Sequence, residues 1–210
     1  MFDMDGVLVD GEPLHFQAVN ELLGAEGHAM SFAEYQPHMG TKYGWAEMIP
    51  QYGLSRPYDH YSRIFRGMMT ERYRTASVAL PGAVDLVRGL QRAGVPLAIA
   101  SSSIREWVEA CLGRIGLLDA FSALTTGDEV VRGKPDPEIY QLAARRIGVP
   151  PSEVLVFEDA PAGILSAKAA GMECWAVRTE YTAGLTLPDP HREFQSLLDV
   201  SVAHVMGVAA

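Results

Sequence analysis

Residues 1–10, MFDMDGVLVD, place three aspartates among apolar neighbours: Asp3, Asp5 and Asp10. Asp3 and Asp5 are separated by a single residue, so both side chains project to one side if the chain leaves a strand in extended conformation. Gly6 then allows the backbone to turn away. The pattern DxDG taken alone has an ordinary alternative explanation, which is a turn with solvated acids.

Two carboxylates this close favour a cation between them. At a separation of about 4 Å and an effective dielectric of about 20 they repel by roughly 4 kcal/mol, so a cation or a shared proton is needed. Ligation by carboxylate and carbonyl oxygens suits Mg²⁺ better than zinc or copper. We therefore expect Mg²⁺ as the cofactor if the acids are functional.

The chain from Leu80 onward alternates short apolar runs with amphipathic stretches. We predict strands at about 95–100, 121–126, 154–157 and 174–177, and helices at about 82–93, 105–115, 137–147 and 162–170. A last short helix is expected within 179–210. Repeated strand–helix units predict an α/β fold with a doubly wound parallel sheet, whose ligands bind at the carboxyl ends of the strands.

Residues 13–77 have helical periodicity and no convincing strand. We therefore predict a helical cap domain at 13–77, inserted into an α/β core formed by 1–12 and 78–210. Only Met1 and Phe2 precede Asp3, so the first strand is either very short or belongs to a chain that naturally starts earlier.

Polar side chains follow three further predicted strands. Ser101 to Ser103 follow the first, Lys134 lies in a Gly-Lys-Pro turn after the second, and Glu158 and Asp159 follow the third. Each has an ordinary explanation by itself, as a helix N-cap, a surface lysine or a solvated acid. Because all of them belong to one edge of the sheet, together they predict a site for a phosphoryl group and its metal.

FDMDG, SSS after an apolar strand, GKPDP and VFEDAPAGI occur in an order and spacing that resemble the haloacid dehalogenase-like hydrolase superfamily. The similarity is to the branch that includes β-phosphoglucomutases and sugar-phosphate phosphatases, and it extends from Phe2 to about Val177. It implies a Rossmann-like core with an inserted helical cap domain. It also implies two-step phosphoryl transfer with an aspartyl-phosphate intermediate.

The resemblance assigns a role to each matching residue. Asp3 matches the nucleophile and Asp5 the general acid/base, whose backbone carbonyl helps to hold Mg²⁺. Ser101 matches a residue that hydrogen-bonds the phosphoryl group, and Lys134 one that neutralises its charge. The implied metal ligands are Asp3, Asp5, Glu158 and Asp159. The second aspartate is absent from the dehalogenases of the superfamily, so dehalogenation is not expected.

The resemblance also points to substrate-binding residues. These are Ser102 in the core and, in the cap, His15, Gly40, Thr41 and Lys42; His15 and Lys42 have ordinary surface explanations that stay open. Asp10 is expected to be a hinge-turn or capping acid, with a place beside the metal site as the alternative.

Three positions of this sequence depart from the pattern of the family that it resembles. By alignment, Tyr43 and Met69 replace the arginine and lysine of β-phosphoglucomutases, and Gly11 replaces the Ser or Thr usual after GVxxD. The first two losses favour hydrolysis over a mutase reaction, because a mutase must hold a bis-phosphorylated intermediate. The third removes a hydroxyl near the general acid/base.

We therefore expect a Mg²⁺-dependent phosphatase acting on a small phosphorylated metabolite, a sugar or polyol phosphate. The alternatives are a hexose-phosphate mutase of the β-phosphoglucomutase type and a non-catalytic protein of the same fold that binds phosphate or a partner. A net charge of −9 disfavours nucleic acid and anionic membranes as partners. Two distant cysteines predict neither disulfide nor zinc site, and we expect a cytoplasmic monomer.

Overall fold

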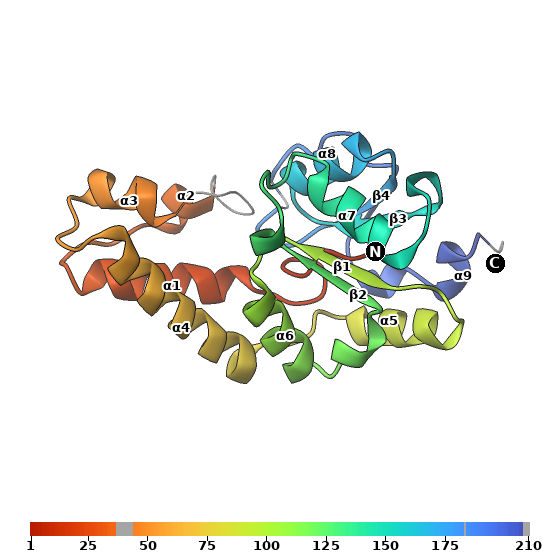
Figure 1. Cartoon of the computed structure of the whole chain (residues 1–210), viewed down its shortest axis with the longest axis horizontal. Coiled ribbons are helices and arrows are strands. Elements are labelled where there is room, and N and C mark those ends of the chain that lie inside the picture. Colours follow the sequence, from red (N-terminus) through yellow and green to blue (C-terminus); the bar gives the residue numbers. More distant parts are fainter. Residues whose placement is uncertain (37–43, 183, 208–210) are drawn as a thin grey trace.

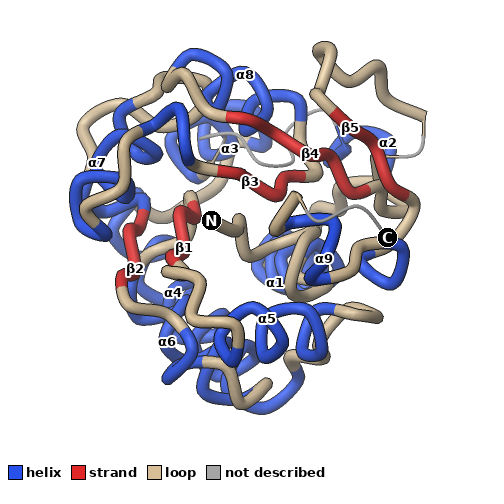
Figure 2. Tube along the Cα trace, turned by 90° about the vertical axis from the view of Figure 1, so that its right-hand side faces the viewer, coloured by secondary structure: helices blue, strands red, loops and turns tan. Residues whose placement is uncertain are grey.

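The computed structural model describes residues 1–36, 44–182 and 184–207. Its strands are parallel: β1 (Ala98–Ser101) pairs with β2 (Ala123–Thr126), while β4 (Glu173–Val177) lies between β3 (Leu155–Glu158) and β5 (Arg192–Phe194). Phe2 bridges Ile99 and Phe157 and so joins the two groups. The order across the sheet is β2, β1, Phe2, β3, β4, β5 (Figure 2).

Helices follow most of the strands and cover the sheet on both sides. They are α5 (Ala83–Arg92), α6 (Arg105–Arg114), α7 (Glu138–Ile147), α8 (Pro161–Ala169) and α9 (Val202–Val205). Short 3₁₀ helices lie at Leu118–Ala120, Gly127–Glu129, Pro151–Glu153 and Leu197–Asp199. The predicted strands and helices of this part are found within a few residues of their expected bounds, whereas β5 was not predicted.

The core is divided between the two faces of the sheet. Ile99, Phe157 and Trp175 pack with residues of α5 and α6. Their strand neighbours on the other face, Val156 and Cys174 among them, pack with residues of α7 and α8. Because both faces are covered, β1, β3 and β4 are mostly apolar runs instead of alternating. The α/β fold with a doubly wound, Rossmann-like sheet is therefore confirmed (Figure 2).

The remaining helices extend to one side of the sheet (Figure 1). They are α1 (Glu12–Gly24), α2 (Phe32–Tyr35), α3 (Trp45–Tyr52) and α4 (Tyr58–Ala76). Val19, Leu23, Met48 and Tyr61 belong to a separate apolar cluster that holds α1, α3 and α4 together. No described helix is both long and apolar enough to cross a membrane. We propose that these helices form the cap, with domain limits at 13 and 77.

The cap also contacts the core beside the site. The Trp107 indole on α6 donates to Arg66 O at 3.2 Å, and Arg66 Nε lies 2.8 Å from Glu106 Oε2. Helix α4 thus packs along α6, which begins shortly after β1 (Figure 1). This contact places the middle of α4 beside the first turn of α6, shortly after the carboxyl end of β1.

Candidate active site

Backbone hydrogen bonds fix Asp3 at the carboxyl edge of the sheet. Phe2 N donates to Ala98 O at 2.9 Å, and Asp3 N donates to Phe157 O at 3.0 Å. The chain leaves the sheet here, between β1 and β3, and turns at Gly6, where φ is +78°. Asp3 is 8% exposed, so its carboxylate lies in a largely desolvated place.

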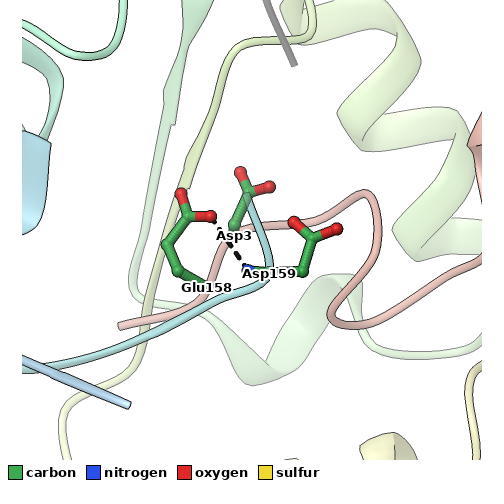
Figure 3. A group of neighbouring side chains, drawn as sticks. All are labelled: Asp3, Glu158 and Asp159. Atoms are coloured by element: carbon green, nitrogen blue, oxygen red, sulfur yellow. Dashed lines mark hydrogen bonds between the residues drawn. The ribbon is translucent and has the colours of Figure 1, made fainter. Parts of the chain in front are cut away.

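Three buried carboxylates meet at this edge (Figure 3). Asp3, Glu158 and Asp159 each contribute an oxygen, and these oxygens lie within 4.8 Å of one another. Glu158 ends β3, and Asp159 follows it directly. Gly6 is needed for this approach, because a Cβ at that position would lie 2.1 Å from Asp159 Oδ2. The structure thus brings together three of the four predicted metal ligands.

Lys134 lies among these acids. Its Nζ donates to Asp3 Oδ1 at 2.8 Å and to Glu158 Oε1 at 2.6 Å, and its side chain is 4% exposed. Glu158 also accepts from Tyr140 OH at 2.6 Å and from Asp159 N at 3.0 Å. These donors fix the Glu158 carboxylate in one orientation.

The electrostatic balance of this group is negative. Burial raises the pKa of Asp3 to about 7, although Lys134 opposes the shift. Burial, and then the neighbouring Glu158, raises the pKa of Asp159 well above its usual range. Desolvation penalises ionised carboxylates unless positive charge is supplied. Lys134 supplies one such charge to three carboxylates.

This donor set fits a magnesium ion. All its ligand atoms are oxygens, which are the ligands that Mg²⁺ prefers, and the single charge of Lys134 leaves part of the negative charge of the three carboxylates uncompensated. Asp5, the fourth predicted ligand, directs its carboxylate elsewhere, so any contribution from it comes from the backbone carbonyl.

The Asp5 carboxylate is held on both oxygens. Tyr73 OH donates to Oδ1 at 2.7 Å, and Ser103 Oγ donates to Oδ2 at 3.0 Å. His15 Nε2 lies 2.8 Å from Tyr73 OH, and burial lowers the pKa of this imidazole, which favours its neutral form. The sequence had assigned a substrate-binding role to His15, none to Tyr73, and to Ser103 only a place in the serine run. Ser103 had a signal in the serine run, whereas nothing local indicated the contact of Tyr73.

The other two serines have different environments. Ser101, at the end of β1, is 1% exposed, and its Oγ accepts from Ser103 N at 3.1 Å. Ser102 is exposed and lines a cavity together with Ser103 and Lys134. Ser102 thus borders the cavity, whereas Ser101 is buried and does not line it.

That cavity has a volume of about 520 Å³ and lies between the cap helices and the loops after β1 and β2. Its wall includes His15 and Glu12, and its aromatic and apolar lining includes Met30, Tyr35, Trp45, Met48, Phe65 and Trp107. Glu12, which the sequence did not indicate, accepts from Tyr35 OH at 2.7 Å, and burial raises its pKa to about 7. The predicted Gly40, Thr41 and Lys42, like Tyr43, lie outside the described residues.

Comparison with known proteins agrees with this architecture. The haloacid dehalogenase-like hydrolase family model matches residues 1–171. Validoxylamine A 7'-phosphate phosphatase of Streptomyces hygroscopicus subsp. limoneus is 34% identical, over 87% of this chain and 86% of that protein. Phosphorylated carbohydrates phosphatase of Thermotoga maritima is 32% identical, over 82% and 81% respectively.

A solved structure shows the same arrangement. The crystal structure of CbbY from Rhodobacter sphaeroides in complex with phosphate is 28% identical and aligns with a TM-score of 0.86, over 98% of this chain and 97% of that one. The segment matched by the family model contains Asp3, Lys134 and the Glu158–Asp159 pair. This chain therefore belongs to the haloacid dehalogenase-like hydrolases.

Proposed function

We propose that the chain is a Mg²⁺-dependent phosphatase that hydrolyses a small phosphorylated metabolite, a sugar or polyol phosphate. The observation that carries this proposal is the buried group of Asp3, Lys134, Glu158 and Asp159 beside a cavity of about 520 Å³. A phosphoryl group brings negative charge and needs a nucleophile, a cation and a proton donor. The residues at this edge of the sheet supply the nucleophile and fit a bound cation.

In the proposed reaction, an Asp3 oxygen attacks phosphorus and forms an aspartyl phosphate while the ester bond breaks. Asp5 gives its proton to the leaving oxygen, then accepts a proton from the water whose oxygen attacks the phosphorus. The second step releases inorganic phosphate and frees Asp3. Lys134 and Ser101 position and neutralise the phosphoryl oxygens. Mg²⁺, held by Asp3, Glu158, Asp159 and the Asp5 carbonyl, would neutralise further charge on the phosphoryl group.

The cavity supports a small organic body on the phosphate. Aromatic rings such as Trp45 and Phe65 can stack on the apolar face of a sugar, and the Glu12 carboxyl can hydrogen-bond hydroxyls. Relatives named as phosphatases of phosphorylated carbohydrates agree with this substrate class. We also propose a cytoplasmic monomer, on the basis of charge and cysteine content.

Hydrolysis is favoured over the mutase reaction at one described position. Met69, aligned with a lysine of the mutases, is 0% exposed and packs in the apolar core. It therefore offers no charge to a second phosphate. A mutase would need that charge to hold its bisphosphate while it reorients.

The test is phosphate release from a panel of sugar and polyol phosphates, in Mg²⁺ and in chelator, with sugar-phosphate isomers monitored in the same tubes. We expect Mg²⁺-dependent release, and a loss of about a thousandfold or more in Asp3→Asn. Asp119→Asn, at a side chain that is 74% exposed, is the matched control and should keep its activity. Isomer conversion without release would establish the mutase instead. Unchanged turnover in Asp3→Asn would refute the nucleophile assignment.

A further inference from the structure

The general acid/base of the proposed reaction lies in an unusual setting. Position 11, which carries a Ser or Thr in similar proteins, is glycine here. A Cβ at Gly11 would lie 1.8 Å from Asp5 Oδ1 and 3.0 Å from Tyr73 OH. The Asp5 carboxylate thus occupies space that a side chain at position 11 would fill.

Tyr73 reaches Asp5 through the same space. Its hydroxyl donates to Asp5 Oδ1 at 2.7 Å, although the two residues are 68 positions apart. The ring is 0% exposed and comes from α4 of the cap. A hydroxyl donor to Asp5 is therefore present, but it comes from another helix and not from position 11.

His15 limits which way the Tyr73 hydroxyl can point. A tyrosine hydroxyl has one proton, and here it is directed to the Asp5 carboxylate. His15 Nε2, 2.8 Å from the same oxygen, must then be the donor, which selects the Nε2–H tautomer. The imidazole is held edge-on against the Trp107 ring, with centroids 5.5 Å apart. The result is a directed chain from His15 through Tyr73 to Asp5.

We propose that Tyr73, oriented by His15, is the positioning residue for Asp5, to which the glycine at position 11 offers no hydroxyl. The inference rests on the proposed function, because it assigns Asp5 the proton transfer. With Oδ1 held by Tyr73, Oδ2 would carry the transferred proton, and the Ser103 hydroxyl, which donates to Oδ2 in this structure, would then turn to accept from it. Gly11 leaves open the space in which the Asp5 carboxylate meets the tyrosine hydroxyl.

The test uses leaving groups that differ in their need for a proton. p-Nitrophenolate leaves without protonation at neutral pH, whereas an alkoxide needs the general acid. We would measure kcat and KM for p-nitrophenyl phosphate, phenyl phosphate and the alkyl phosphate that the wild type hydrolyses best. Proper general acid catalysis contributes about 10²–10⁴-fold, so we expect Tyr73→Phe to lower kcat on the alkyl phosphate by about 10–100-fold. On p-nitrophenyl phosphate the loss should stay below about threefold, with KM little changed.

Two further variants separate positioning from folding. Gly11→Ala forces the Asp5 carboxylate away from Tyr73 and should give the same selective loss. Combined with Tyr73→Phe it should add little, because both changes act on one contact. Tyr61→Phe is the matched control: it removes a hydroxyl from a residue of the same helix that is 2% exposed and bonded to Glu26, and it should show no selectivity between leaving groups.

Asp5→Asn separates the failure of this inference from failure of the proposed function. If Asp5→Asn is not selective for the alkyl phosphate, Asp5 is not the general acid, and the proposed mechanism is wrong. If Asp5→Asn is selective for the alkyl phosphate, but Tyr73→Phe lowers kcat equally on all three substrates or on none of them, Tyr73 does not position Asp5.

Discussion

Replacing Lys134 by methionine removes the one ammonium group that contacts the buried acids of the described site. Methionine keeps much of the length of the side chain, which is 4% exposed, so the change is mainly one of charge. Asp3, Glu158 and Asp159 would then face one another without a compensating cation. We expect the metal-free variant to be strongly destabilised and unable to release phosphate.

The contact distances give the size of the effect. Lys134 Nζ lies 2.8 Å from Asp3 Oδ1 and 2.6 Å from Glu158 Oε1, and each pair is worth about 6 kcal/mol at an effective dielectric of about 20. Several kcal/mol of this attraction are offset by the desolvation of the ammonium group. Removing one partner from a buried ion pair therefore costs about 3–5 kcal/mol. We expect a loss of that size in the free energy of unfolding at pH 7 in chelator.

Mg²⁺ should reduce this loss, because the ion binds the same carboxylates. A tenfold tighter Mg²⁺ affinity in Lys134→Met would narrow the stability gap by about 1.4 kcal/mol at saturation. The assay is urea unfolding of both proteins in chelator and over a Mg²⁺ titration. Lys168→Met is the control, because its pair with Asp189, whose side chain is 97% exposed, should contribute about 1 kcal/mol or less and respond to no metal. Equal stabilities in chelator, or a gap that Mg²⁺ does not change, would refute the reasoning.

Gly6→Ala should raise the Mg²⁺ concentration needed for activity by about tenfold or more, because its Cβ would lie 2.1 Å from Asp159 Oδ2. Gly27→Ala is the control, because Gly27 has a φ of +80° and open space around it. This control carries the same backbone strain of about 1–2 kcal/mol and should leave the Mg²⁺ titration unchanged. Glu129→Gln tests the partly exposed ion pair between Glu129 and Arg146, because Arg146 lowers the pKa of Glu129 to about 2. A lowered carboxyl pKa stabilises the fold above the unfolded-state pKa of about 4.5 and loses this effect as the pH falls toward 2. We expect Glu129→Gln to lower the free energy of unfolding by about 1–2 kcal/mol at pH 7, a value discounted because the side chain is 24% exposed. Urea unfolding at pH 3 should give a smaller difference between the variant and the wild type. A difference that does not depend on pH would contradict the assignment.

The acidic edge of the site could be predicted from sequence because topology places it there. Parallel strands end at one edge, so polar residues that follow each strand meet whatever their separation along the chain. Asp3, Lys134 and Glu158 follow this rule, and the structure brings them into contact. Their local signals were short apolar runs followed by charged residues, which are readable from sequence alone.

Contacts between layers were not predictable in the same way. Helical periodicity places Tyr73 on a buried face of α4, but it does not say which polar atom the hydroxyl reaches. The contact depends on how α4 packs along α6, which is a property of side-chain shapes far apart in sequence. β5 was missed for another reason: Arg192 and Glu193 are exposed, so the strand has no apolar run to indicate it.

Positions 11 and 73 show why a mismatch with a family motif is weak evidence of lost function. Read along the chain, Gly11 lacks a hydroxyl beside the general acid/base. In the structure, the Tyr73 hydroxyl lies 2.7 Å from Asp5 Oδ1, in an arrangement that a Cβ at position 11 would disrupt because it would lie 1.8 Å from that oxygen. The donor then belongs to the cap, so the orientation of Asp5 depends on where α4 lies relative to the core. In this protein the orientation of the proposed acid therefore depends on the packing of the cap. Substitutions in α4 that shift Tyr73 should reduce the rate of proton transfer more than they reduce the affinity for phosphate.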